Sequence, residues 1–359
     1  MTTFQDFALP EALQHKLDAL GFDKPTPVQE RAIPAALEHR DILGSAQTGT
    51  GKTAAFSIPL LTKIMNHADV YGIIVTPTRE LALQVDEQIR AFLSAKSKIR
   101  SVVLIGGASI ERQVQALGKR PKIVVGTPGR IIDHLERKSL DLSGFNYVVL
   151  DETDRMLDMG FSAPIAEIFS HVSEERQTLL FSATLPKNIQ KISAQYLQNP
   201  VRIEMGQVNS VGDNIVQSTQ FVSKDGKFGM LVDALREHDQ SAIVFMNSKF
   251  ATEKMAKRLK SAGITAEAIH GDLRQSKRER VISNLRDNKF RVLVATDVAA
   301  RGIDVPHIHQ VINFDLPRQT EDYIHRIGRT GRNGAQGIAL NLATRDDMEK
   351  LNDIERLIN

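Results

Sequence analysis

The sequence of 359 residues contains no cysteine and no tryptophan, and only 5% of its residues are aromatic. Without cysteine, the chain can form no disulfide bond and offers no thiolate ligand to a metal ion. The shortage of aromatic side chains argues against a platform on which unpaired nucleobases stack. If the chain binds a nucleic acid strand, we therefore expect it to hold the backbone.

Long apolar runs are also missing from the sequence. No segment approaches the roughly 18 apolar residues of a membrane-spanning helix, and the N-terminus lacks the apolar stretch of a signal peptide. Together with the absence of cysteine, this predicts a cytoplasmic protein. The formal net charge of +3 permits nucleic acid binding but is too small to establish it.

Short apolar runs recur along the chain, and each precedes a small or polar residue and then a helical pattern. They lie at 41–47, 72–77, 101–107, 122–128, 147–152 and 178–184, and at 241–248, 291–297, 310–315 and 337–343. Apolar runs without alternation, separated by helices, predict buried parallel strands. Because ligands bind at the carboxyl ends of such strands, we expect ligand surfaces in both halves.

A polar segment that contains two glycines and lacks helical periodicity separates the two halves. We expect a linker at 206–216 between an N-terminal domain at 1–205 and a C-terminal domain at 217–359. Each domain is expected to be α/β, with a mostly parallel sheet flanked by helices. The alternative is a surface loop within one large domain, which the usual size limit of a single core argues against.

The segment SAQTGTGKT, residues 45–53, follows the first predicted strand and precedes a helical pattern. It matches the Walker A pattern except at Ala46, which stands where the pattern has glycine. The backbone N–H groups of such a loop cradle phosphate oxygens. We therefore expect Lys52 to hold the β- and γ-phosphates and Thr53 to bind Mg²⁺. A glycine-rich turn with a surface lysine is the alternative.

The run YVVLDE leads directly into three acids, Asp151, Glu152 and Asp154. A buried carboxylate is costly unless a cation or hydrogen-bond donors surround it. Since parallel strands end at one edge of a sheet, we expect Asp151 to face the Mg²⁺ of a bound nucleotide and Glu152 to orient or deprotonate the attacking water. Without the Walker A segment, the same acids would fit an ordinary solvated strand end.

Short motif-like segments follow one another along essentially the whole chain. They are GFDKPTPVQ (21–29) with Phe4 upstream, AQTGTGKT (46–53), PTRELALQ (77–84), Gly106-Gly107, TPGR (127–130), DETD (151–154), SAT (182–184), VFMNS (244–248), GDLRQSKR (271–278), ATDVAARGID (295–304) and HRIGRTGR (325–332). In this order they resemble the motifs of the DEAD-box RNA helicases of superfamily 2. The flanking text RMLDMGF resembles the bacterial RhlE-type branch. The resemblance implies two tandem RecA-like domains and an ATP-dependent RNA helicase.

The resemblance assigns the nucleotide contacts. It implies that Phe22 stacks on adenine and that Gln29 reads the adenine edge, although a phenylalanine before a proline-rich turn also fits a core position. The other implied nucleotide contacts are Thr48, Gly49, Thr50, Gly51, Lys52, Thr53, Asp304, Arg329 and Arg332. The implied catalytic residues are Lys52, Glu152, Arg329 and Arg332. The two arginines would act as arginine fingers on the γ-phosphate, whereas HRIGRTGR alone also fits a solvated turn.

The resemblance also assigns a strand site made of hydroxyls, arginines and N–H groups near glycine. Its residues are Pro77, Thr78, Arg79, Gly107, Thr127 and Arg130 in the first half, and Arg278 and Thr296 in the second. Such groups suit phosphate oxygens and 2′-hydroxyls, and they read base edges poorly. We therefore expect RNA binding that depends on salt and hardly on sequence. The implied coupling residues are Asp154, Ser182, Thr184 and Arg326, with Arg326 linked to DETD, which corresponds to motif II of the family.

Thr153 departs from the family pattern, which has alanine at this position of motif II. If the strand pleat continues, Asp151 and Thr153 point to one side and Glu152 to the other. The Thr153 hydroxyl is then expected to bond to a backbone carbonyl or to the hydroxyls of Ser182 and Thr184. The alternative is that it contacts the catalytic water and alters hydrolysis.

These features lead to one functional hypothesis and two alternatives. The hypothesis is RNA-stimulated hydrolysis of ATP, with Mg²⁺, coupled to domain closure and to local separation of short duplexes or remodelling of ribonucleoproteins by a monomeric core. The alternatives are a DNA-directed motor of superfamily 2 and an ATP-gated RNA clamp with little unwinding. The family allows for helper proteins. It often carries a C-terminal extension, which we expect here because the last helical pattern stops without a cap.

Overall fold

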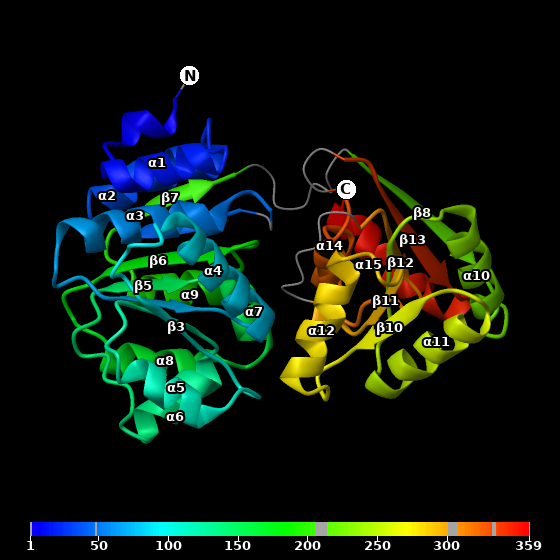
Figure 1. The fold of residues 1–359 in the computed structure, drawn as a ribbon. Helices are drawn as coiled ribbons and strands as arrows, with labels where there is room; N and C mark the ends of the chain where they lie inside the picture. Colours follow the sequence, from blue (N-terminus) through cyan, green and yellow to red (C-terminus); the bar gives the residue numbers. More distant parts are fainter. Residues whose placement is uncertain (1, 47–48, 206–213, 301–307, 332–334, 359) are drawn as a thin grey trace. The chain divides into compact units, whose positions relative to one another are not determined.

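The chain forms two compact units, residues 1–208 and 209–359, each with a parallel sheet between two layers of helices (Figure 1). The computed structural model describes all residues except 1, 47–48, 206–213, 301–307, 332–334 and 359. In the part that it describes, no helix is both long and apolar enough to span a bilayer. The two units confirm the predicted α/β fold class.

The sheet of the first unit has seven strands in the order β3-β4-β2-β5-β6-β1-β7, and all recorded pairings are parallel. The strands are β1 (Ile42–Ser45), β2 (Gly72–Val75), β3 (Ser101–Leu104), β4 (Ile123–Gly126), β5 (Tyr147–Leu150), β6 (Gln177–Ser182) and β7 (Val201–Glu204). Because β6 lies between β1 and β5, the segments that follow these three strands meet at one stretch of the carboxyl edge. The segments after β2, β4 and β3 continue that edge beyond β5.

Helices cover both faces of this sheet. They are η1 (Phe4–Phe7), α1 (Glu11–Ala19), α2 (Pro27–Leu37), α3 (Lys52–Asn66), α4 (Arg79–Phe92), α5 (Ile110–Leu117), α6 (Pro128–Glu136), α7 (Thr153–Asp158), α8 (Ser162–His171) and α9 (Lys187–Tyr196). The core on one face contains side chains of η1 and α1 to α4, and the core on the other contains side chains of α5 to α9. Successive strand residues such as Ile42 and Leu43 enter opposite cores, which explains the continuous apolar runs.

The second unit repeats this architecture with six parallel strands in the order β10-β11-β9-β12-β13-β8. The strands are β8 (Ile215–Phe221), β9 (Ala242–Phe245), β10 (Ala266–Ile269), β11 (Val292–Ala295), β12 (Gln310–Asn313) and β13 (Gly337–Ala343). The helices are α10 (Lys227–Glu237), α11 (Lys249–Ser261), α12 (Gln275–Arg286), α13 (Asp297–Ala300), α14 (Glu321–Ile327), η3 (Arg345–Asp347) and α15 (Met348–Ile358). Helices α10 and α11 share one core, whereas α12 to α15 share the other.

Each of the ten predicted runs contains a strand, and three further strands escaped the sequence pattern. Strand β7 is an edge strand with exposed alternate residues, and β10 reads AEAI, which has little β propensity. Strand β8 is mostly exposed and polar. The predicted linker is wrong at its end, because Ile215 and Val216 pair with β13 as part of β8. The rest of that segment, up to 213, lies outside the described residues.

Candidate active site

The Walker A segment turns from β1 into α3 at the carboxyl edge of the first sheet. Gly49 and Gly51 have φ of 87° and 91°, a backbone conformation that favours glycine. A Cβ on Gly51 would also lie 2.3 Å from the Gln29 side-chain nitrogen. The segment therefore depends on glycine for both conformation and clearance. Thr48, predicted to contact the nucleotide, lies outside the described residues.

Lys52 begins α3 and is only 6% exposed. Its Nζ has no hydrogen-bond partner among the described residues. A buried ammonium without an acceptor is costly, so this position fits an anionic ligand such as a phosphate group. Thr53 follows in the first turn of α3, and its contact with Mg²⁺ stays a prediction.

The segment GFDKPTPVQ, residues 21–29, which resembles the Q motif of the family, lies beside the Walker A backbone and bonds to it. Thr26 Oγ1 donates to the Thr50 carbonyl at 2.7 Å, and Gln29 Nε2 donates to the Gly51 carbonyl at 3.1 Å. Gln29 Oε1 accepts from Thr26 N at 2.9 Å, as in a capping box of α2. Phe22 packs edge-on between Phe4 and Phe92, with ring centroids 5.6 and 5.4 Å away. Contact of Phe22 and Gln29 with adenine stays a prediction.

Asp151 follows β5 and is 2% exposed. Burial raises the pKa of its carboxyl group to about 6, although the nearby Lys52 ammonium acts in the opposite direction. The neighbouring Glu152 carboxylate raises this pKa further. A divalent cation would remove the repulsion and favour the ionised carboxylate, so the surroundings of Asp151 fit a magnesium ligand.

Glu152 ends the pleat, contrary to the expected alternation of side chains. Its φ and ψ are 51° and 50°, which is left-handed, and α7 begins at the next residue. The prediction that Asp151 and Thr153 share one face of a continued strand is therefore wrong, because the backbone turns at Glu152. The Glu152 carboxylate is buried and forms an ion pair with Arg155, with 3.0 Å between Oε2 and Nη1.

Thr153 is fully buried, and its hydroxyl lies between two strand carbonyls. Its Oγ1 is 3.3 Å from the Leu150 oxygen and 3.1 Å from the Phe181 oxygen, and it donates to them. One acceptor belongs to β5 and the other to β6. Of the two predicted kinds of partner for this hydroxyl, the structure therefore shows the backbone carbonyls. It does not show a bond to the hydroxyls of Ser182 or Thr184.

We expect Thr153→Ala to change RNA-stimulated ATP turnover by less than about tenfold, or about 1.4 kcal/mol of barrier. The hydroxyl bonds to backbone rather than facing the phosphate site, so its loss removes a hydrogen bond of the fold. Steady-state kinetics at saturating RNA measures this. A loss of 100-fold or more with unchanged ATP affinity would instead make Thr153 part of the catalytic machinery.

Asp154 joins motif II to the SAT segment. Its Oδ2 accepts from Ala183 N at 2.9 Å, from Thr184 N at 3.0 Å and from Thr184 Oγ1 at 3.3 Å. Ser182 is buried at the end of β6, and its hydroxyl has no partner among the described residues. The structure therefore brings Asp154 and Thr184 together and leaves Ser182 outside that contact.

The strand residues predicted in the first unit lie after β2, β3 and β4, which are neighbours in the sheet. Thr78 caps α4, and its neighbour Arg79 lies beside the Gly106 backbone. Gly107 has a φ of 80°. Buried Pro77 precedes this cap, and Thr127 occupies the N-cap position of α6. These residues form one stretch of the carboxyl edge, separated from the Walker A segment by β5 and β6.

Arg130 is largely engaged within the first unit. Its Nη1 donates to the Ala108 carbonyl at 3.1 Å and to Gln113 Oε1 at 3.2 Å, and its Nε lies 3.3 Å from the Asp133 carboxylate. It thus holds the turn that contains Gly107 as well as offering charge to that edge.

In the second unit, Thr296 and Arg278 lie near the ends of β11 and β10. Thr296 N is 3.4 Å from the Ile269 oxygen, and Arg278, which is 5% exposed, donates from Nη1 to His270 O at 3.5 Å. Neighbouring strands thus place both residues at the carboxyl edge of the second sheet. Asp304 and Arg332, predicted to contact the nucleotide, lie outside the described residues.

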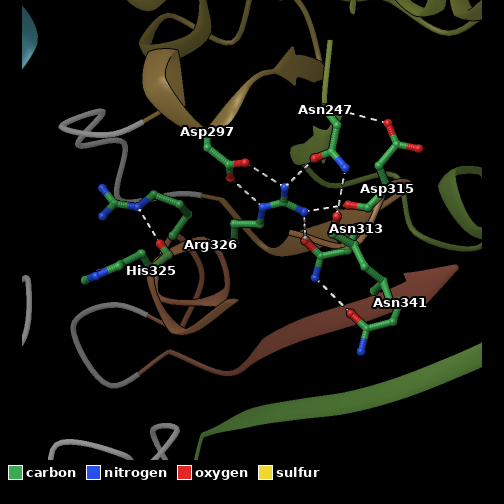
Figure 2. A network of polar contacts seen from close by, with 9 residues as sticks. Asn247, Asp297, Asn313, Asp315, His325, Arg326 and Asn341 are labelled. Atoms are coloured by element: carbon green, nitrogen blue, oxygen red, sulfur yellow. Dashed lines mark hydrogen bonds and ion pairs between the residues drawn. The ribbon is translucent and has the colours of Figure 1, made fainter. Parts of the chain in front are cut away.

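Arg326 is surrounded by acceptors of its own unit, as Figure 2 shows. Its donors reach both Asp297 carboxylate oxygens at 2.5 and 2.8 Å, Asn313 Oδ1 at 3.0 Å, the Asp315 carbonyl at 2.6 Å and Asn247 Oδ1 at 3.2 Å. All five N–H groups are therefore used. Arg326 thus supports its own unit, and its link to motif II stays a prediction.

Arg329 follows α14, one turn after His325. It is buried, and its Nε donates to the His325 carbonyl at 3.1 Å. The bonds of Arg326 fix α14 to the ends of β9, β11 and β12, so they also fix the segment that carries Arg329.

Sequence reasoning missed the residues that hold these functional groups. Asn247, Asp297 and Asn313 orient Arg326, and Arg155 contacts Glu152. Asp297 stands in a recognised motif, and Arg155 directly follows DETD, so a search for charges opposite each acid or arginine could have found both. Nothing in the sequence marked Asn313, which lies inside an apolar run.

The fold and the site define a P-loop ATPase with two α/β domains and polar carboxyl edges. Residues 26–192 match the DEAD/DEAH box helicases, and residues 226–334 match the helicase conserved C-terminal domain. The chain is 44% identical to the DEAD-box ATP-dependent RNA helicase CshA of Geobacillus kaustophilus over 99% of this chain and 76% of that protein. It is 45% identical to CshA of Bacillus anthracis, over 99% of this chain and 68% of that one.

Solved structures agree with these relatives. Dbp5 of S. cerevisiae, bound to RNA and ADP BeF3, is 31% identical with a TM-score of 0.90, and the match covers 100% of this chain and 94% of that chain. A DEAD box protein from Methanococcus jannaschii is 40% identical with a TM-score of 0.57, over 100% and 97% of the two chains. The chain belongs to the DEAD-box ATP-dependent RNA helicases, and its domains are RecA-like. Membership of the RhlE-type branch stays a prediction.

Proposed function

We propose that this protein hydrolyses ATP in response to RNA, and that closure of its two domains on both ligands separates short duplexes locally. The observation that carries the proposal is the meeting of three strand ends in the first unit. They bring three features to one edge: the Lys52 ammonium, which has no hydrogen-bond partner in the described part of the chain, the buried Asp151 carboxylate, and the bond between Asp154 and the SAT segment. One phosphate chain with its metal ion would satisfy the charges of Lys52 and Asp151.

Thr53 and Asp151 are the residues that we propose to hold Mg²⁺, in Asp151's case through water. When bound, the ion neutralises charge on the phosphate oxygens. The fit rests on the buried Asp151 carboxylate, which lacks enough positive charge around it to restore an ordinary pKa. Lys52 would hold the β- and γ-phosphates, and Phe22 and Gln29 would hold the adenine.

The proposed chemistry uses groups from both units. Glu152 would orient or deprotonate the attacking water, and Arg329, with Arg332, would stabilise the charge that develops on the γ-phosphate. Lys52 and Arg329 lie in different units, so hydrolysis requires the units to close. We propose that residues 206–214 act as the linker that permits closure, and that Asp154 and Thr184 communicate nucleotide binding to the strand site.

We propose that RNA lies along the carboxyl edges, over β2, β4 and β3 in the first unit and β10 and β11 in the second. The groups there are hydroxyls, arginines and backbone N–H groups, which suit a sugar–phosphate backbone. The similarity to Dbp5, which is bound to RNA and ADP BeF3 in its solved structure, supports this assignment. We further propose a monomeric core in the cytoplasm, with helper proteins among its partners.

ATP turnover with RNA and with DNA of matched sequence tests the proposal. We expect single-stranded RNA to stimulate hydrolysis and DNA to do so weakly, because the strand site would use 2′-hydroxyls. Equal stimulation by DNA would favour the DNA-directed motor, and no stimulation by either would reject the proposal.

Gln29→Ala should weaken ATP binding and narrow the preference for ATP over GTP. A side-chain amide donates and accepts at once, which matches adenine and mismatches guanine. The structure adds a second effect, because the variant also loses the bond from Gln29 to the Gly51 carbonyl. Competition binding with ATP and with GTP separates the loss of adenine recognition from the loss of the bond to Gly51. An unchanged preference with weaker overall binding would leave only the structural role.

Arg130→Ala and Arg278→Ala should each weaken binding to all single-stranded RNAs alike and lower the salt slope by about 1. Each removes one charge near a proposed phosphate contact. Arg137→Ala is a matched control, because Arg137 is exposed at the opposite end of α6 from Arg130. Binding titrations at several salt concentrations measure the slope. A loss confined to one RNA sequence would indicate base recognition instead.

A further inference from the structure

Arg155 is a buried arginine that the reaction outlined above does not use. It lies in α7, three residues after Glu152, and is 1% exposed. Its Nη1 donates to Glu152 Oε2 at 3.0 Å, and the side chains of the pair are 1% and 5% exposed. The proposed catalytic carboxylate is therefore enclosed in an ion pair with Arg155.

Stability of the domain does not explain this pair. The Nε and Nη2 atoms of Arg155 are buried and have no hydrogen-bond partner among the described residues. Desolvation of an arginine whose buried donors are unsatisfied costs free energy. This cost offsets much of the stability that the ion pair contributes. An apolar side chain of similar size would fill the same space at lower cost.

The local backbone places Arg155 within reach of the Glu152 side chain. Glu152 stands in left-handed conformation between β5 and α7, at the N-cap position of the helix. Arg155 is at the third helical position, so its guanidinium reaches back over one turn to the carboxylate. The Arg155 main-chain N–H donates separately to Asp154 Oδ1 at 3.0 Å, a bond that a change of the Arg155 side chain leaves in place.

We propose that Arg155 is a positioning residue for ATP hydrolysis, which holds Glu152 Oε2 and so fixes the direction of the carboxylate toward the attacking water. The inference rests on the proposed function, because it takes Glu152 as the group that orients or deprotonates that water. The planar guanidinium defines the direction of its N–H groups, whereas a lysine supplies the charge with a looser geometry.

Turnover of Arg155→Met and Arg155→Lys tests the proposal. We expect Arg155→Met to lower kcat of RNA-stimulated hydrolysis roughly 10²-fold, the scale of a displaced catalytic group, with KM for ATP within about twofold. Arg155→Lys should recover most of the loss. Arg90→Met is a matched control, because it breaks another ion pair of the first unit, to Asp86 at 2.9 Å, and should leave kcat unchanged.

A double-variant cycle separates positioning from a general effect on the fold. If Arg155 acts through Glu152, then Glu152→Gln combined with Arg155→Met should be no slower than Glu152→Gln alone. This double variant has no unpaired buried charge, so it keeps the test available should Arg155→Met alone fail to fold. Its melting temperature should match or exceed that of Glu152→Gln.

Three outcomes would overturn the inference: an unchanged kcat in Arg155→Met, losses in the two single variants that multiply in the double variant, or an Arg155→Lys protein as slow as Arg155→Met. Each of these outcomes counts against the inference only if the wild-type protein hydrolyses ATP when RNA is added. Wild-type protein without that stimulation would reject the proposed function instead, so the two failures are distinguishable.

Discussion

Arg329→Ala should lower RNA-stimulated ATP turnover about 10³-fold and leave ATP affinity nearly unchanged, since this is the scale for loss of an arginine finger. Arg329 lies in the second unit, whereas the Walker A segment lies in the first. If the adenine and phosphates are held by the first unit, binding survives the substitution. The charge that develops in the transition state loses its partner, so kcat falls.

Arg356→Ala is a suitable control, because its side chain is 80% exposed on α15 of the same unit. It removes the same charge without touching the segment around Arg329. Single-turnover hydrolysis and nucleotide binding should be measured on both variants. Wild-type turnover in Arg329→Ala would refute the assignment of the finger, and lost ATP binding would place Arg329 in ground-state recognition.

Glu152→Gln should lower turnover by roughly 10³-fold, within the range for loss of a general base. Glutamine keeps the size of the side chain and an oxygen that can accept from Arg155, so the fold around α7 should persist. ATP and RNA binding should remain close to wild type, because Lys52 and the strand residues are unchanged. The variant should therefore accumulate a complex with both ligands that hydrolyses slowly.

Glu111→Gln provides the control, since Glu111 is exposed in α5 and bonds only locally to Ser109. Co-sedimentation or anisotropy with labelled RNA, in the presence of ATP, measures the trapped complex. Turnover of Glu152→Gln within tenfold of wild type would show that another group activates the water.

Much of the fold could be predicted because its strands are buried on both faces. Runs such as Tyr147–Leu150 are apolar throughout. Such a run can be recognised as a buried strand even where the ends of the neighbouring helices are assigned incorrectly. Strands β8 and β10 could not be found this way, because one is largely exposed and the other is built from alanine, glutamate and a single isoleucine. Their pairing depends on neighbours distant in the sequence.

The candidate site was predictable where chemistry depends on a contiguous motif. The Walker A glycines have the expected backbone conformation, and Asp151 lies close enough to Lys52 for its pKa to respond. The geometry of Glu152 was not predictable, because the strand ends in a left-handed conformation that residues other than glycine rarely adopt. The prediction assumed that the strand pleat continues past Leu150, and it therefore placed the side chains of Glu152 and Thr153 on the wrong sides.

The partners of Arg326 were unpredictable for a related reason. Its acceptors come from three separate segments of the second unit, at the ends of β9, β11 and β12, and a count of arginines in HRIGRTGR says nothing of where those acceptors lie. Once all five donors are used, the residue becomes a structural support of α14. Arg329, three residues later, remains the proposed contact to the nucleotide.

Strand displacement on a short RNA duplex is the measurement that tests the helicase proposal most directly. With ATP, wild-type protein should release the labelled strand, and Arg329→Ala should do so at a rate reduced in proportion to its turnover. Little release without nucleotide should be seen for either protein. ATP hydrolysis and RNA binding without any strand release, on duplexes short enough to separate locally, would contradict the proposal and favour an ATP-gated clamp.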